Sequence, residues 1–136
     1  MELYLDTNIY MAFSNMDEEW YCQAQQLLTD IVSCKHSILF SDLVERELEK
    51  KSREKKVNYR KHLDQLSKIP NKTRKLEIRE NTRKIAKDIH IHHPDCVHLA
   101  ICKENGVVLV CFDYDAVEEA KENGITALHF TELWTI

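Results

Sequence analysis

The sequence predicts an α/β protein, in which helices cover both faces of a short, mainly parallel sheet to form a three-layer α/β/α sandwich. Two observations carry this prediction. Short apolar runs alternate with segments whose apolar residues recur at helical spacing, as in successive strand–helix units. The 136 residues contain only two Gly and two Pro, so few breakers interrupt these units. The length fits one domain, residues 1–136, with a single core.

Four apolar runs predict the strands of the sheet. The run 107–112 is continuous and rich in β-branched residues, as in a parallel strand that is buried on both faces. It stops abruptly at an acidic segment, and the first run does the same. The four predicted strands cover residues 2–5, 36–40, 107–112 and 125–128.

Helices are predicted between these strands from apolar spacing and from helix boundary signals. Trp20, Ala24, Leu27 and Ile31 form one helical stripe, which the acidic residues 17–19 precede. The remaining helices are expected at 9–13, from Ser41-Asp42 to about 53, at 59–66, at about 73–89, from His93-Pro94-Asp95 to 105, and at 116–123.

Composition excludes several classes of protein. No apolar run approaches the roughly 20 residues of a transmembrane helix, and the N-terminus lacks the order of a signal peptide, so we expect a cytoplasmic protein without membrane association. The five cysteines contain no Cys-x-x-Cys pair, and Cys96, Cys102 and Cys111 are expected to be buried thiols. The histidines at 90, 92, 93 and 98 do not have the spacing of a zinc site.

Charge is distributed unevenly along the chain, although the overall net charge is only −4. Residues 46–87 contain 16 Lys and Arg against 6 Asp and Glu, which gives this basic helical segment a net charge of +10. The rest of the chain carries the balance of −14. An acidic body with a basic flank suits a metal-dependent enzyme that acts on a polyanion, and a solvated helical surface rich in Lys would show the same pattern.

Several carboxylates follow predicted strands or begin the helices beside them. Asp6 follows the first strand, and Asp113 and Asp115 follow the third. Because parallel strands end at one edge of a sheet, these groups are expected to lie together there, with Asp95 and Glu47 from neighbouring helices. Carboxylates gathered in this way repel one another unless a cation neutralises them, and hard oxygen donors suit Mg²⁺ or Mn²⁺.

Four short motifs, in this order along the chain, resemble the pattern of the PIN domain family. They are Leu5-Asp6-Thr7-Asn8, Ser41-x-Leu43-Val44-x-x-Glu47-Leu48, Asp95-x-x-His98-Leu99-Ala100 and Phe112-Asp113-x-Asp115. The resemblance spans residues 3 to about 130. It implies a metal-dependent ribonuclease, since members are typically such enzymes. Many are VapC-type toxins paired with an antitoxin protein, and dimers are common among them.

The resemblance also implies roles for individual residues of this chain. The catalytic acids would be Asp6, Glu47, Asp95 and Asp113; the metal ligands Asp6, Asp95, Asp113 and Asp115; and the supporting polar groups Thr7 and Asn8. Glu45 competes with Glu47 for the second position. His98 is expected to pack or to hydrogen-bond rather than to bind metal.

In this interpretation Mg²⁺ or Mn²⁺ would bind the scissile phosphate of RNA and activate a water molecule. Basic side chains of the segment 46–87 would contact RNA phosphates, with affinity that falls as salt rises. The candidate RNA-binding residues are Lys50, Lys51, Arg53, Arg60, Lys61, Arg79 and Arg83.

Three other interpretations remain open from the sequence. The chain could be an inactive PIN-like module that binds RNA or a protein, or a structural protein whose acidic residues cap helices. A phosphatase of related topology is less well supported, because a haloacid-dehalogenase-like enzyme would have Asp where this chain has Asn8, and no Gly-rich phosphate loop is present.

Overall fold

The computed structural model describes residues 1–33, 36–91 and 95–135. Strands and helices alternate along the chain. In order they are β1 (Glu2–Leu5), α1 (Thr7–Ser14), α2 (Tyr21–Val32), β2 (Ser37–Ser41), α3 (Asp42–Lys55), α4 (Lys61–Ser67), β3 (Thr73–Leu76), α5 (Glu80–Lys87), α6 (Asp95–Asn105), β4 (Val108–Cys111), α7 (Tyr114–Glu122), β5 (Ala127–His129) and a 3₁₀ helix (Phe130–Thr135).

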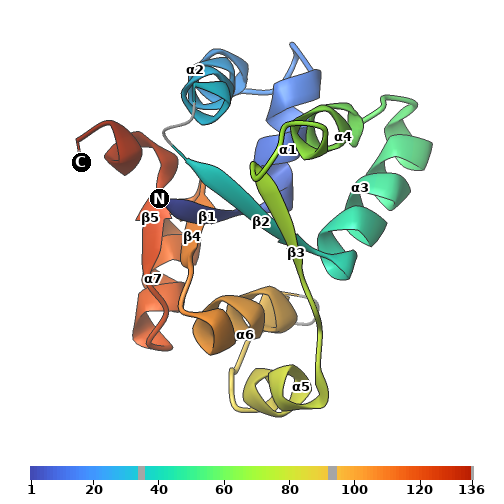
Figure 1. Ribbon diagram of the computed structural model, residues 1–136. Coiled ribbons are helices and arrows are strands. Elements are labelled where there is room, and N and C mark those ends of the chain that lie inside the picture. The colour runs from blue at the N-terminus through green and yellow to red at the C-terminus, as the bar shows by residue number, and fades with distance from the viewer. Residues whose placement is uncertain (34–35, 92–94, 136) are drawn as a thin grey trace.

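The five strands form one sheet in the order β3-β2-β1-β4-β5, and every neighbouring pair is parallel. Helices cover both faces, with α1 to α4 on one side and α5 to α7 on the other (Figure 1). On the first side α1 packs against α2, α3 and α4, and on the second α5 packs against α6. The predicted α/β class, the three layers and the parallel sheet are therefore confirmed.

The core lies on both sides of β1, the central strand. Leu3, Tyr4 and Leu5 are completely buried, as expected for a parallel strand with helices on both faces. The stripe predicted for α2 faces the same core through Leu27 and Ile31. The thiols of Cys96, Cys102 and Cys111 are free and buried, as the sequence predicted, whereas Cys22 is exposed.

The prediction of one continuous helix over 73–89 was wrong, because this stretch is a strand followed by a shorter helix. Residues 73–76 form β3, which pairs with β2 from Ile38 opposite Thr73 to Ser41 opposite Leu76. Arg74 and Lys75 are exposed on this edge strand, where charged side chains oppose pairing with another chain. The chain enters β3 after Asn71, whose φ of 61° is incompatible with a helix.

Helix α5 then begins only at Glu80, where an acidic residue is favourable for the helix dipole. Its buried face includes Thr82. Helix α6 begins at Asp95. The two residues predicted to precede Asp95 in the helix start, His93 and Pro94, lie outside the described residues, as does His92. No helix in the described ranges combines the length and apolarity that crossing a membrane requires.

Candidate active site

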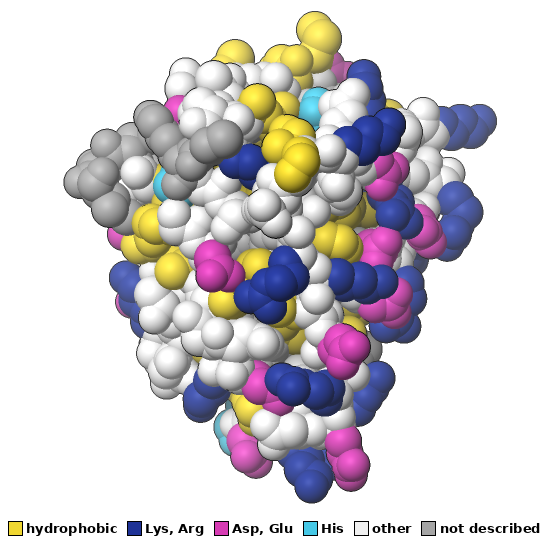
Figure 2. Space-filling view, viewed as in Figure 1, with side chains coloured by type: hydrophobic (Ala, Val, Ile, Leu, Met, Phe, Trp, Pro, Cys, Tyr) yellow, Lys and Arg dark blue, Asp and Glu magenta, His cyan; other side chains and the backbone are white. Residues whose placement is uncertain are grey.

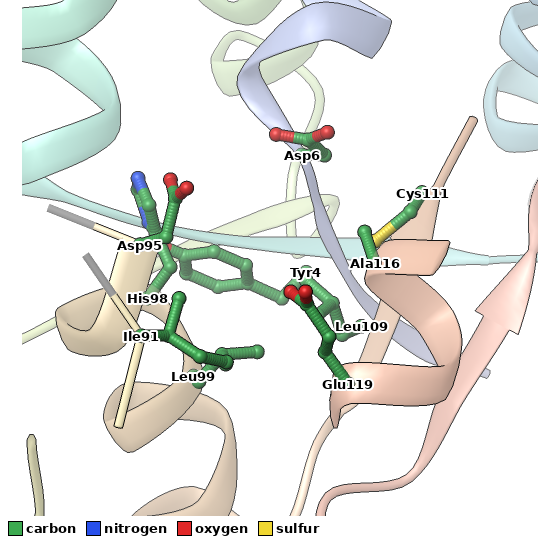
Figure 3. A pocket seen from close by; sticks show the side chains of 10 residues that line it. All are labelled: Tyr4, Asp6, Ile91, Asp95, His98, Leu99, Leu109, Cys111, Ala116 and Glu119. Atoms are coloured by element: carbon green, nitrogen blue, oxygen red, sulfur yellow. The ribbon is translucent and has the colours of Figure 1, made fainter. Parts of the chain in front are cut away.

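The strand order places a crevice where the carboxyl ends of β1 and β4 meet. The connection that leaves β1 covers one face of the sheet and the connection that leaves β4 covers the other, so the helices diverge between these strands (Figure 1). Open parallel sheets bind ligands at such a switch point. A pocket of about 70 Å³ lies here, and we call it the acidic pocket (Figure 3); it is lined by Tyr4, Asp6, Ile91, Asp95, His98, Leu99, Leu109, Cys111, Ala116 and Glu119.

Asp6 reaches this pocket from the end of β1. It occupies the N-cap position of α1. Burial raises the pKa of Asp6 to about 6, and Asp95 and Glu47 raise it further while His98 opposes them. A buried carboxylate beside two others is stabilised by a cation.

Asp95 and Glu119 face the same pocket from two different helices. Asp95 is the first residue of α6, and Figure 3 shows its carboxylate and that of Asp6 on the same side of the ring of Tyr4. Glu119 projects into the pocket from α7, one turn after Ala116, which also lines it. Glu119 was not among the residues predicted from the sequence. An acidic residue inside an amphipathic helix carries no signal that separates it from its solvated neighbours.

Asp113 and Asp115 lie beside the pocket and are exposed, and neither lines it. The Asp113 carboxylate accepts the backbone N–H of Asp115 at 2.9 Å and caps α7. The pKa of the buried Cys111 thiol is raised by burial and then by Asp6, Asp113 and Asp95. The structure therefore brings Asp6 and Asp95 together in the pocket, with Asp113 close enough to act on the same buried group.

Glu47 and Glu45 point to different sides of α3, and only Glu47 turns towards Asp6. The Oε1 atom of Glu47 accepts a hydrogen bond from Thr7 Oγ1 at 3.2 Å and another from His98 Nε2. Glu45 instead binds Arg60 at 2.8 Å and Lys75 at 2.5 Å. Of the two residues between which the sequence left the choice open, Glu47 therefore contacts Thr7 and His98 beside the pocket, whereas Glu45 is paired with basic residues.

A chain of buried hydrogen bonds fixes Glu47 from the far side of the sheet. The hydroxyl of Tyr4 lies 2.8 Å from Ser41 Oγ and 2.6 Å from His98 Nδ1. His98 thus bridges the Tyr4 hydroxyl at Nδ1 and the Glu47 carboxylate at Nε2. His98 has the hydrogen-bonding role expected from the sequence, and Thr7 supports Glu47. The side chain of Asn8 is exposed, and its backbone amide donates to Asp6.

The acidic pocket fits a divalent cation in the kind of ligand it offers. Asp6, Asp95 and Glu119 present hard oxygen donors to one small space, and the pKa of Asp6 is raised first by burial and then by the neighbouring carboxylates of Asp95 and Glu47. Within the described residues, no three Asp, Glu, His or Cys side chains are close enough to hold an ion as they stand. Binding would therefore require side-chain rotation, which the exposed Glu119 permits.

The candidate RNA-binding residues differ in whether their charges are paired with acidic residues of the protein. Arg60 contacts Glu49 at 2.6 Å and Glu45 at 2.8 Å, so its charge is largely satisfied within the protein. Lys51 pairs with Glu54, and Arg79 with Glu104. The remaining candidates are exposed: Lys50, Arg53, Lys61 and Arg83. Figure 2 shows Lys and Arg interleaved with Asp and Glu on the side where Figure 1 places α3, rather than one uniform basic patch.

The protein is therefore a parallel α/β domain whose candidate site is a carboxylate-lined pocket at the switch point of the sheet. The sequence profile described as PIN domain matches residues 3–123. The chain belongs to the PIN domain family. Among curated proteins, none matches this sequence.

Solved structures with the same fold include members of VapBC pairs. VapBC2 from Rickettsia felis, bound to a DNA fragment from its promoter, has 16% identity and a TM-score of 0.69, covering 95% of this chain and 98% of that one. VapBC-1 from nontypeable Haemophilus influenzae has 15% identity and a TM-score of 0.66, covering 96% and 99%. VapC20 from Mycobacterium tuberculosis, a Sarcin-Ricin loop cleaving toxin, has 15% identity and a TM-score of 0.64, covering 85% and 93%. At these identities the likeness shows the fold.

Proposed function

We propose that this PIN domain protein is a Mg²⁺- or Mn²⁺-dependent endoribonuclease that hydrolyses phosphodiester bonds at the acidic pocket. The observation that carries the proposal is the meeting of Asp6 and Asp95 at the switch point, where burial and neighbouring acids raise the pKa of Asp6 to about 6. A site of fixed, uncompensated carboxylates is poor at holding anionic RNA by itself. With a cation it becomes a site for phosphate.

In this proposal the residues of the site have separate roles. Asp6 and Asp95 would hold the metal, with Asp113 and Asp115 at the edge of the pocket as further ligands, and Glu47 would orient the site through the hydrogen bonds from Thr7 and His98. The bound metal would supply charge neutralisation of the phosphate and a lower pKa for the attacking water. Leu99 and Leu109 form apolar parts of the pocket wall.

RNA would approach along the carboxyl edge of the sheet. A second hollow, of about 500 Å³, lies at the carboxyl ends of β2 and β3, and Arg46, Lys75 and Arg83 contribute to its lining. Arg46 and Lys75 share Asp42 as a partner, whereas Arg83 is exposed. Phosphate contacts of this kind position RNA without reading its sequence.

The cellular setting that we propose is a toxin–antitoxin pair, with an antitoxin protein as partner and a homodimer as the assembly. The support is the shared fold with the VapBC pairs from Rickettsia felis and Haemophilus influenzae. A reading frame for a small antitoxin immediately upstream of the gene would support this setting, and its absence would favour a nuclease of RNA maturation or decay.

A second candidate function is an inactive PIN-like module that binds RNA or a protein without cleaving. It is favoured by the finding that, in the described part of the chain, no three possible ligand side chains are gathered closely enough for a metal as they stand. Under this candidate, the carboxylates would be remnants of a site.

Cleavage of a labelled single-stranded RNA with Mg²⁺, Mn²⁺ or EDTA separates the two. The ribonuclease proposal expects cleavage that needs the metal and falls at least about 100-fold in Asp6→Asn, since removing one ligand disrupts the site. Asp17→Asn is the matched control, because Asp17 is an exposed acid outside the pocket. RNA binding without metal-dependent cleavage by the wild type would instead establish the inactive module.

A further inference from the structure

Tyr114 is an exposed aromatic residue held rigidly beside the candidate active site. Its residue exposure is 62%, and its ring stacks on the ring of His129. The two ring centroids are 3.8 Å apart and the planes differ by 3°, which is a parallel stack. One face of the Tyr114 ring is therefore covered and the other is open to solvent.

The His129 ring that supports this stack is itself fixed. His129 is buried, with 2% exposure, and its Nε2 lies 2.7 Å from the backbone carbonyl of Phe112. Because a carbonyl only accepts, Nε2 carries the proton and Nδ1 accepts from the hydroxyl of Thr131 at 2.7 Å. Trp20 and Phe130 pack against the same ring. The orientation of Tyr114 is thus set by a buried aromatic cluster.

The position of Tyr114 relates this ring to the acidic pocket. It stands between Asp113 and Asp115, at the first residue of α7. Two residues later in the same helix, Ala116 lines the pocket, and Glu119 follows one turn further on. The stack on His129, which contacts the backbone of Phe112 just after β4, places Tyr114 at the carboxyl edge of the sheet, the edge where the pocket lies and along which RNA would approach.

We propose that the open face of Tyr114 stacks on a base of single-stranded RNA, next to the phosphate held at the acidic pocket. This inference rests on the proposed function. The base would complete a three-layer stack of base, Tyr114 and His129. Stacking tolerates every base, because each has a π face, so the contact would position a nucleotide and would demand an unpaired strand.

The test measures binding with Ca²⁺ in place of Mg²⁺ or Mn²⁺, so that the acidic pocket can still hold a cation and a phosphate while cleavage does not interfere. Fluorescence anisotropy in Ca²⁺ would compare the wild type, Tyr114→Ala and Tyr114→Phe, using a short labelled single-stranded RNA and, as a base-free polyanion, heparin. Tyr114→Ala should weaken RNA binding about 5- to 140-fold. This range corresponds to the ~1–3 kcal/mol of one stacked base, since 1.4 kcal/mol changes affinity tenfold. Tyr114→Phe keeps the ring and should bind RNA within about twofold of the wild type.

Two controls separate stacking from other effects. Met16→Ala removes another exposed apolar side chain, with 77% exposure, and should leave RNA binding unchanged. Heparin binding should be the same for Tyr114→Ala and the wild type, because phosphate contacts are not altered. A 2-aminopurine base placed in the RNA should be quenched on binding by the wild type and by Tyr114→Phe, but not by Tyr114→Ala.

Three results would overturn the inference. They are equal RNA binding by Tyr114→Ala and the wild type, equal losses for RNA and heparin, and no RNA binding by the wild type. The first two leave the ribonuclease proposal intact if metal-dependent cleavage is observed in parallel. The third, together with an absence of cleavage, would remove both. A Tyr114→Ala variant that does not melt like the wild type would be replaced by Tyr114→Leu, which must show the same loss.

Discussion

His98 holds the carboxylate of Glu47 through its Nε2 nitrogen, although 51 residues separate them in the sequence. Its other nitrogen is hydrogen-bonded to the hydroxyl of Tyr4, which is buried in the central strand. Tyr4 in turn contacts Ser41, the N-cap of α3, the helix that carries Glu47. The sheet and two helices are thus joined by one polar chain whose end is a candidate site residue.

This chain predicts energetic coupling between Tyr4 and His98. Tyr4→Phe and His98→Ala each leave a buried polar partner unsatisfied, so each should lower the free energy of unfolding by about 1–3 kcal/mol. The double variant should lose at least ~0.5 kcal/mol less than the sum of the two single losses, because the shared hydrogen bond is already gone. Urea denaturation of the four proteins measures the cycle. Strictly additive losses would mean that the two residues act independently.

Arg60 should matter for stability rather than for RNA. Arg60→Met would remove contacts from the start of α4 to Glu45 and Glu49 of α3 and leave these acids without their partner, at a cost of about 1–2 kcal/mol in unfolding free energy. Arg83→Ala should change stability by less than ~0.5 kcal/mol. It should lower the salt slope of RNA binding by about 0.7, the value for one lost phosphate contact on a single strand. A lower salt slope of RNA binding in Arg60→Met, together with a loss of stability in Arg83→Ala, would contradict this prediction.

The raised pKa of Asp6 predicts that this residue destabilises the metal-free protein at neutral pH. Its carboxyl titrates near pH 3.8 when unfolded and near 6 when folded. Below both values it is neutral in both states. Between them only the unfolded chain is ionised, so stability falls as pH rises, and above pH 6 the full destabilisation is present.

Asp6→Asn should accordingly raise the free energy of unfolding in EDTA by an amount on the order of 1–3 kcal/mol at pH 8. The difference from the wild type should vanish near pH 3.5. Urea denaturation at both pH values provides the measurement. An Asp6→Asn variant that is less stable than the wild type at pH 8 would show that the carboxylate is compensated in the folded protein.

Glu119 should contribute to the acidic pocket, whereas Glu118 beside it on α7 should not. If Glu119 turns towards a bound cation, Glu119→Gln should weaken Mn²⁺ binding by about 3- to 30-fold, as for loss of one outer carboxylate. Glu118→Gln removes the same charge from an exposed position that does not line the pocket, and should leave Mn²⁺ binding within about twofold. Equal effects of the two variants would indicate only a general loss of negative charge.

The parts of this protein that the sequence could predict are those with local signals. The apolar strands that end at Asp6 and at Asp113, and the start of α6 at Asp95, combine composition with an abrupt boundary, and the sheet places these ends together. Strand β3 was not predicted, because it is a four-residue edge strand, paired with β2, in which Arg74 and Lys75 are exposed. Its sequence therefore contains no apolar run that would indicate a strand. Its structure depends on pairing with β2, which is distant in the sequence.

The missed features of the site have the same cause. The chain from Ser41 through Tyr4 and His98 to Glu47 joins residues far apart in sequence, so no local spacing rule connects them, although three of the four stand in the motifs that resemble the family pattern. The fixed ring of Tyr114 depends on His129, fifteen positions later, which no spacing rule connects to it. Glu45 and Glu47 could be separated only as two faces of one helix; which face meets Asp6 depends on how α3 packs.

The central claim is that the acidic pocket is a divalent metal site built on Asp6. Calorimetric titration with Mn²⁺ of the wild type, Asp6→Asn, Asp95→Asn and the control Asp17→Asn tests it most directly. We expect saturable binding to the wild type and to Asp17→Asn, and at least about tenfold weaker binding to the other two variants. Equal Mn²⁺ binding by all four proteins, or no binding by the wild type, would contradict it.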